Sequence, residues 1–259
     1  MARTSLPSRT AWILPLGILF CLGLALTPST WAQESTQQSQ GILLPEAIRT
    51  LSVKFARTYA PAGGVSEQSS GWIYCEAPSR VLVKVEKPIE QIMEVEGEHV
   101  RIYYPLTGEA FDILTSFSES LPFLHLFLLG GLDEDAGLER SGFALKRYET
   151  RGDTTFAYWD PPISARKAFG SAVLTRLGQA LLCVEMLDPK GRTLLRNECS
   201  GTLEHSGYQF PSQVSVRVFK GRGRGVDSAS YSELTINDPL PEWVRSFQLP
   251  VGAVVKDLR

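Results

Sequence analysis

The chain has 259 residues, of which 43% are hydrophobic and 21% are charged, with 26 Lys and Arg against 28 Asp and Glu. The ordinary apolar fraction and a net charge of −2 exclude a chain that is mainly disordered. The balance of charges provides no global basic field, so we expect no nucleic-acid partner.

The N-terminus has the features of a secretory signal. Two arginines precede the uncharged apolar run from Ala11 to Leu26, and small residues follow, with Ala32 at the expected cleavage point. The alternative is a retained membrane anchor, but an uncharged run of roughly 16 residues is short for a membrane span. We therefore expect residues 1–32 to be a cleaved signal peptide.

The remaining chain contains no internal repeat and no linker. Residues 33–43 form a polar tract that predicts a disordered leader, and residues 44–259 are expected to form a single domain. Its first part predicts an amphipathic helix that ends at Pro61–Gly64, because apolar residues recur at steps of four, three, four and four. These residues are Leu44, Ile48, Leu51, Phe55 and Tyr59.

After Gly64 the apolar period changes to two. Val81, Val83 and Val85 alternate with Leu82 and Lys84, and turn signals containing Gly or Pro separate such runs. The pattern predicts an antiparallel meander. Further expected strands are Val100–Ile102, Phe143–Glu149, Thr154–Trp159, Leu181–Leu187, Thr193–Cys199 and Val214–Phe219.

A second helix is predicted between the early and late strands. It covers about Ser116 to Leu129, is unusually apolar, and is followed by two glycines. Phe117, Leu121, Leu124 and Leu128 share one side of this helix.

Three cysteines remain after the expected cleavage. Cys183 and Cys199 flank the turn Asp188–Gly191 at comparable distances, which would bring them together across a hairpin, whereas Cys75 has no such neighbour. An exported protein can hold a disulfide, but an odd count leaves one cysteine over. Both a Cys183–Cys199 bridge and free thiols therefore stay open.

The sequence contains no recognisable catalytic or metal motif. His99, His125 and His205 have no partner at the spacing of a triad or a metal site, and no nucleophile-elbow or phosphate-loop motif occurs. We expect no enzyme, no metal and no cofactor. The basic, glycine-rich segment Lys220–Gly225 is interpreted as a flexible hairpin tip, the alternative being weak docking to an anionic headgroup or an acidic partner.

The segment GWIYCEAPSRV, Gly71 to Val81, resembles the opening hairpin of the outer-membrane lipoprotein carrier family, the LolA-like proteins. The similarity runs from about Leu44 to Asp257. Its further short motifs are Lys87-Pro88, Ile92, Glu96-Gly97, Ile102–Pro105, Phe210-Pro211 and Phe247–Val254. The sequence departs from the family at Ala77, where well-studied carriers have an arginine that anchors a lid. The resemblance therefore does not imply this way of anchoring a lid.

The resemblance implies an α+β, mostly β fold: an incomplete antiparallel β-barrel, that is, a curved sheet, with helices covering an apolar concave face. It also implies a hydrophobic cavity for acyl chains. The expected lining residues are Ile73, Val81, Val83, Val85, Ile92 and Ile102 from the sheet, with Leu124 and Leu128 from the covering helix.

The function implied is that of a periplasmic, non-catalytic carrier that moves lipoproteins from the inner to the outer membrane. Its partners would be acylated lipoproteins or lipid, an inner-membrane release complex and an outer-membrane receptor, and the carrier would be a monomer. The alternative is a lipid-binding or envelope-stress sensor module on the same scaffold.

Overall fold

The computed structural model describes residues 48–77, 80–96, 99–114, 135–136, 138–139, 142–219 and 225–258. Several expectations lie outside these residues and remain expectations. They are the signal peptide 1–32, the leader 33–43, the helix 116–129 with Leu124, His125 and Leu128, and residues 220–224 of the basic segment.

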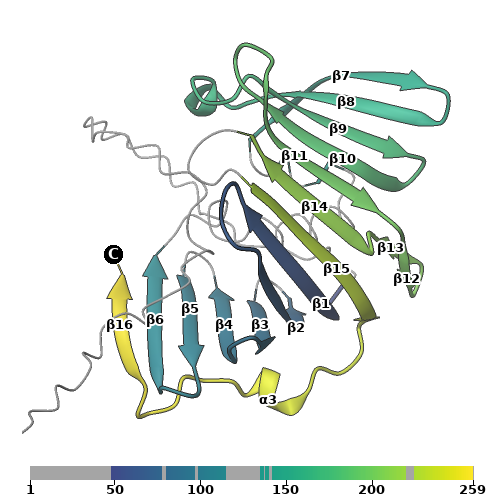
Figure 1. The fold of residues 1–259 in the computed structure, drawn as a ribbon. Coiled ribbons are helices and arrows are strands. Elements are labelled where there is room, and N and C mark those ends of the chain that lie inside the picture. The colour runs from purple at the N-terminus through teal and green to yellow at the C-terminus, as the bar shows by residue number, and fades with distance from the viewer. Residues whose placement is uncertain are drawn as a thin grey trace, which may run out of the picture.

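The described chain is built mainly of β-strands (Figure 1). The early strands are β1 (Thr50–Pro61), β2 (Glu67–Glu76), β3 (Arg80–Lys87), β4 (Gln91–Glu96), β5 (His99–Tyr104) and β6 (Glu109–Leu114). The later elements are β7 (Ala144–Arg151), β8 (Thr154–Asp160), η1 (Ile163–Ala165), β9 (Ser171–Leu177), β10 (Ala180–Leu187), β11 (Thr193–Ser200), β12 (Leu203–His205), β13 (Tyr208–Phe210), β14 (Gln213–Val218), β15 (Gly225–Ile236), α3 (Glu242–Arg245) and β16 (Val254–Leu258).

Fourteen of the strands form one curved sheet in the order β16-β6-β5-β4-β3-β2-β1-β15-β14-β11-β10-β9-β8-β7. Its strand pairs are antiparallel except for β16, which runs parallel to β6. The two edge strands, β7 and β16, do not pair with each other, so the sheet bends without closing (Figure 1). The expected mostly β, curved open sheet is therefore confirmed, as are the strands predicted from alternation.

The first predicted helix is wrong, because Leu51, Phe55 and Tyr59 lie in strand β1, while Ile48 precedes the strand and Leu44 lies outside the described residues. Leu51 and Phe55 are spaced four apart, and an even spacing keeps two side chains on the same face of a strand as well. Val53, which lies between them, is also buried, so the true period is two. β-Branched and aromatic residues favour the strand, and β1 pairs with both β2 and β15 along its length.

One face of the sheet carries the main hydrophobic core, and we call it the concave face. Alternate residues of successive strands point into it, as the period of two requires. The residues that define it on the early strands are Leu51, Val53, Phe55, Ile73, Cys75, Val81, Val83, Val85, Met93, Val95, Val100, Ile102 and Ile113. On the later strands they include Ala157, Trp159, Ala172, Leu174, Val184, Cys199, Val214, Val216, Ala229 and Tyr231.

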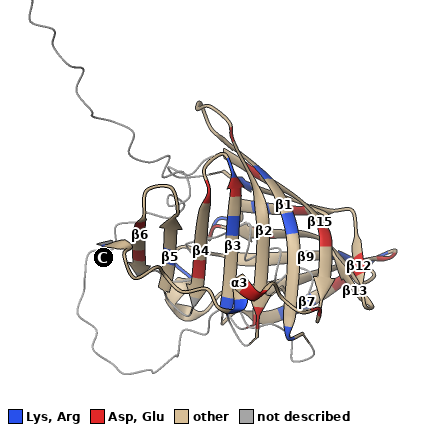
Figure 2. Ribbon diagram, turned by 90° about the horizontal axis from the view of Figure 1, so that it is seen from below, with Lys and Arg blue, Asp and Glu red and all other residues tan. Residues whose placement is uncertain are grey.

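The opposite, outer face carries a smaller core beneath residues 237–253, which we call the C-terminal strap. The strap connects β15 with β16 and contains α3, which Figure 2 shows against the outside of the early strands. Leu240 and Val244 of the strap pack with Tyr74 and Leu82 of the sheet. No helix in the described part of the chain has the length and apolar character needed to cross a membrane.

Candidate ligand-binding face

The early strands place the predicted lining residues in continuous rows across the concave face. Ile73 pairs with Val83, which faces Met93, and Met93 pairs with Ile102. The row continues to Val53 on one side and to Phe111 on the other. A second row contains Leu51, Cys75, Val81, Val95, Val100 and Ile113. Adjacent strands thus present a continuous strip of apolar side chains.

Five of the six described residues that the sequence assigned to this lining lie on the concave face, and Ile92 does not. Ile92 pairs with Lys84 and Tyr103 and packs with the outer core. Because neighbouring residues of a strand point to opposite faces, its neighbours Met93 and Gln91 take the concave positions. Strict alternation counted back from Val95 would have identified Met93.

The apolar concave face also holds an ion pair that is largely buried. Arg57 Nε donates to Asp227 Oδ1 at 2.8 Å, and Arg57 Nη2 donates to Asp227 Oδ2 at 2.6 Å. The two side chains are only 11% and 14% exposed. Nearby, burial raises the pKa of the Tyr231 phenol, and the charge of Asp227 adds to that shift. The guanidinium of Arg57 and the carboxylate of Asp227 therefore already neutralise each other.

A buried amide lies two strands away from this ion pair. Asn197 is 0% exposed and belongs to the row Val184, Asn197, Val216, Asp227 and Tyr59. Its Nδ2 lies 3.9 Å from Cys199 Sγ, whereas its Oδ1 has no hydrogen-bond partner among the described residues. Nothing in the sequence singled out Asn197, because only the alternation of β11 shows that it points inward.

The Cys183–Cys199 disulfide is not formed, and the three described cysteines are free. Cys183 lies opposite Glu198, the residue before Cys199 in β11. Cross-strand partners share a face and sequence neighbours do not, so the two thiols point to opposite faces of the sheet. Equal distance from the hairpin turn is therefore not enough to predict a disulfide between two cysteines. Burial raises the pKa of Cys199 to about 12 and also raises the pKa values of Cys75 and Cys183.

On the outer face, Arg80 anchors the C-terminal strap. Its guanidinium donates to the carbonyl oxygens of Val244 and Phe247, each at 3.0 Å. It also contacts Glu94 Oε1 at 3.0 Å, and Arg101 contacts the other oxygen of this carboxylate at 3.2 Å. Arg80 therefore points away from the concave face, and it holds the C-terminal strap.

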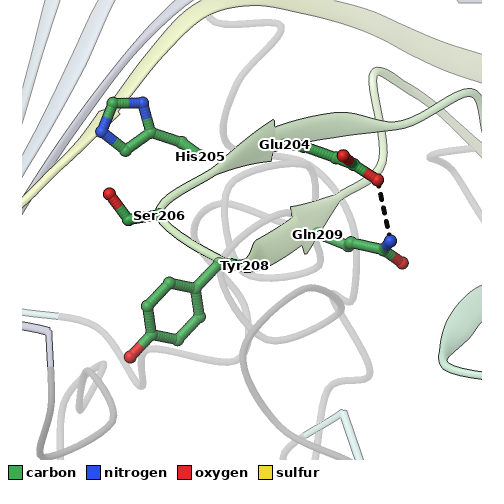
Figure 3. Close-up of a pocket in the computed structure, with 6 residues that line it drawn as sticks. Glu204, His205, Ser206, Tyr208 and Gln209 are labelled. Carbon is green, nitrogen blue, oxygen red and sulfur yellow. Dashed lines mark hydrogen bonds between the residues drawn. The ribbon is translucent and has the colours of Figure 1, made fainter.

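The described histidines do not meet at a common site. His99 contacts Asp112 near the edge of the sheet, and His205 lies at the tip of the β12–β13 hairpin. A hollow of about 300 Å³ at that tip is lined by Glu204–Gln209 (Figure 3). All of its described lining comes from the single β12–β13 hairpin, so no side chains from separate parts of the described chain converge on it. In the described ranges, no group of three or more His, Cys, Asp or Glu could hold a metal ion.

Comparison with known proteins supports the fold. No protein-family model and no curated protein matches the sequence. Among solved structures, a LolA superfamily protein from Nitrosomonas europaea is 14% identical, with a TM-score of 0.51 and coverage of 76% of this chain and 89% of that one.

A DUF1329 family protein from Desulfovibrio piger has a TM-score of 0.56 at 14% identity, covering 76% of this chain and 90% of that one. A candidate outer membrane lipoprotein-sorting protein domain from Vibrio parahaemolyticus has a TM-score of 0.51 at 12% identity, with coverage of 76% and 89%. At these identities, the chain shares the LolA-like fold with these proteins.

Proposed function

We propose that the protein is a non-catalytic carrier that binds the acyl chains of lipoproteins on its concave face and moves them from the inner to the outer membrane. The observation that carries this proposal is the continuous apolar strip across β1–β6, centred on Ile73, Val83 and Ile102. Each CH₂ group removed from water stabilises a complex by about 0.8 kcal/mol, so a lining without specific polar contacts can hold an acyl chain.

Two further points support the proposal. The fold is shared with a LolA superfamily structure and with a candidate outer membrane lipoprotein-sorting protein domain. The sequence also begins with features of an export signal, so the proposal includes cleavage after Ala32 and a periplasmic location. It further includes residues 116–129 as the cover of the concave face, with Leu124 and Leu128 toward the acyl chains.

The proposal is tested with the purified chain Gln33–Arg259 and an acylated lipoprotein in detergent-free buffer. We expect a soluble complex that coelutes in size-exclusion chromatography, with the same lipoprotein lacking its acyl chains as the matched control. A lipoprotein that precipitates equally with and without the protein would rule out the carrier function. Binding of free lipid without lipoprotein would favour the alternative, a lipid-binding or envelope-stress sensor module.

Depletion in cells separates these two functions. A carrier is required for sorting, so its depletion should leave outer-membrane lipoproteins at the inner membrane. Loss of a sensor would leave their distribution unchanged and alter a stress response. Fractionation of the two membranes, followed by detection of several lipoproteins, measures the difference.

A further inference from the structure

Asn197 is an unusual residue for its position. Its neighbours in the same cross-strand row are Val184 and Val216, and it is 0% exposed. An amide at such a place forfeits hydrogen bonds to water, and a buried polar atom without a partner costs stability. Nearly all buried polar groups in proteins are paired, so the unpaired Oδ1 of Asn197 requires an explanation.

The location of Asn197 supplies an explanation for this unpaired atom. Asn197 lies on the same concave face as the proposed acyl-binding strip, three strands from β1, and its unpaired atom is an acceptor. A ligand that lies along this face can pair with the Oδ1 atom only by donating a hydrogen bond to it. We propose that Asn197 Oδ1 accepts a hydrogen bond from the amide N–H of an amide-linked acyl chain, and thereby selects amide-linked over ester-linked ligands. This inference rests on the proposed acyl-binding function.

The charges nearby favour a neutral donor. Asp227 lies about 10 Å from Asn197, two strand spacings along the sheet, and Arg57, one strand further along, neutralises its charge. A carboxylate ligand would meet a guanidinium already held by two hydrogen bonds, and an ammonium would have to give up its water in an apolar region. An amide N–H next to an alkyl chain carries no charge and matches both the acceptor and its apolar neighbours.

The test compares two probes that differ in one atom. Decanoyl glycine methyl ester has an amide N–H, and methyl decanoyloxyacetate has an ester oxygen in its place. Each competes with a fluorescent acyl probe bound to the chain Gln33–Arg259. One hydrogen bond to an otherwise unpaired buried acceptor is worth about a fivefold to tenfold difference in affinity. We expect the wild-type protein to bind the amide more tightly by that factor.

The variant Asn197→Leu has a side chain of similar branched shape and no acceptor. We expect it to bind both probes with equal affinity, and its thermal midpoint to be unchanged or higher, because an unpaired buried group is removed. Glu198→Gln is the matched control, since Glu198 follows Asn197 in β11 and is exposed on the outer face. This control should keep the wild-type preference.

Three results of these binding measurements would each contradict a stated claim. Equal binding of the two probes by the wild-type protein would overturn the inference and leave the carrier proposal intact. A preference that survives in Asn197→Leu would place the acceptor elsewhere and also overturn it. Failure of the wild-type protein to bind either probe would contradict acyl binding itself. The wild-type comparison requires no variant, so it stands even if Asn197→Leu does not fold.

Discussion

Glu94 is a buried carboxylate on the outer face, and its side chain is 7% exposed. Arg80 and Arg101 contact its two oxygens, and Arg80 also donates to carbonyl oxygens of the C-terminal strap. A buried charge is tolerated when it is paired and fully hydrogen-bonded, and it is costly when one partner is removed. At the scale of single residues, Arg80 therefore joins sheet and strap through one planar group with several donors.

We expect Arg80→Met to lower the free energy of unfolding by about 3 kcal/mol, because Glu94 loses its closer partner and two strap carbonyls lose their donor. Urea denaturation measures the change. Arg101→Met is the control and should cost about 1 kcal/mol or less, since Arg101 is more exposed. The double variant Arg80→Met with Glu94→Leu should recover part of the loss; no recovery would contradict this assignment.

The buried thiols make stability depend on pH in the alkaline range. Burial raises the pKa of Cys199 to about 12, whereas an unfolded thiol titrates near about 8.5. Below the unfolded value both states keep the proton, so the thiol has no effect on stability. As the pH rises from there toward the folded value, only the unfolded state loses the proton. The free energy of unfolding should then fall by about 1.4 kcal/mol per pH unit for each such thiol.

Urea denaturation between pH 8 and pH 10 checks this dependence, and Cys199→Ala should show a shallower decline than the wild-type protein. Cys183→Ala serves as the comparison, because Cys183 is partly exposed and its burial-induced shift is opposed by Arg196. Equal slopes for Cys199→Ala and the wild-type protein would show that Cys199 ionises as readily in the folded state as in the unfolded state.

At the scale of elements, β1 shows why one apolar pattern can support two structures. Leu51 and Phe55 satisfy a helical spacing and a strand spacing at once, and only Val53 between them separates the two. Pairing decides between the two structures: β1 has a partner on each side, β2 and β15, and the paired residues of β15 are about 165 to 185 positions away in sequence. A local pattern contains no information about such a distant partner.

We expect the C-terminal strap to contribute to the stability of the fold and β16 to protect the edge of the sheet from self-association. Truncation after Pro250 removes β16 and leaves Leu240, Val244 and the Arg80 contacts in place. We expect this chain to fold and to self-associate, because β6 would then have an unpaired edge. Light scattering after size-exclusion chromatography measures the association, and a strictly monomeric product would contradict the prediction.

Truncation after Asn237 should be more damaging, since it also removes the strap. Leu240 and Val244 are both almost fully buried, and burial of each side chain stabilises the fold by about 1.5 to 3 kcal/mol. We expect a loss of about 3 to 6 kcal/mol in the free energy of unfolding relative to the truncation after Pro250. Equal stability of the two truncated chains would show that the strap adds nothing to the fold.

At the scale of the whole molecule, an open sheet creates two faces with different environments. The concave face gathers apolar side chains from all strands of the large sheet except the two edge strands β7 and β16. The outer face carries the Arg80–Glu94 ion pair and the C-terminal strap, whose helix α3 Figure 2 shows against the early strands. Since β7 and β16 remain unpaired to each other, curvature brings distant strands around one interior without closing it. This arrangement is the basis of the proposed acyl-binding function.

Val83→Thr tests whether the concave face contacts acyl chains. Threonine matches valine in volume and adds a hydroxyl, so we expect affinity for a fluorescent acyl probe to fall about fivefold. Lys84→Thr, the next position and on the outer face, is the control and should leave affinity unchanged. If Val83→Thr lowers the thermal midpoint but leaves affinity as in the wild-type protein, Val83 belongs to a core that the ligand does not touch.

The sequence by itself determined the mostly β character, the alternating strands such as Val81–Val85, and the resemblance to LolA-like proteins, because alternation and turn residues are local signals. Tertiary structure alone decided that β1 is a strand, that Ile92 faces outward, and that Cys183 and Cys199 lie on opposite faces. It also placed Asn197 among valines. The physical reason is register: a shift of one residue moves a side chain to the other face, and register is fixed by strands far apart in the chain.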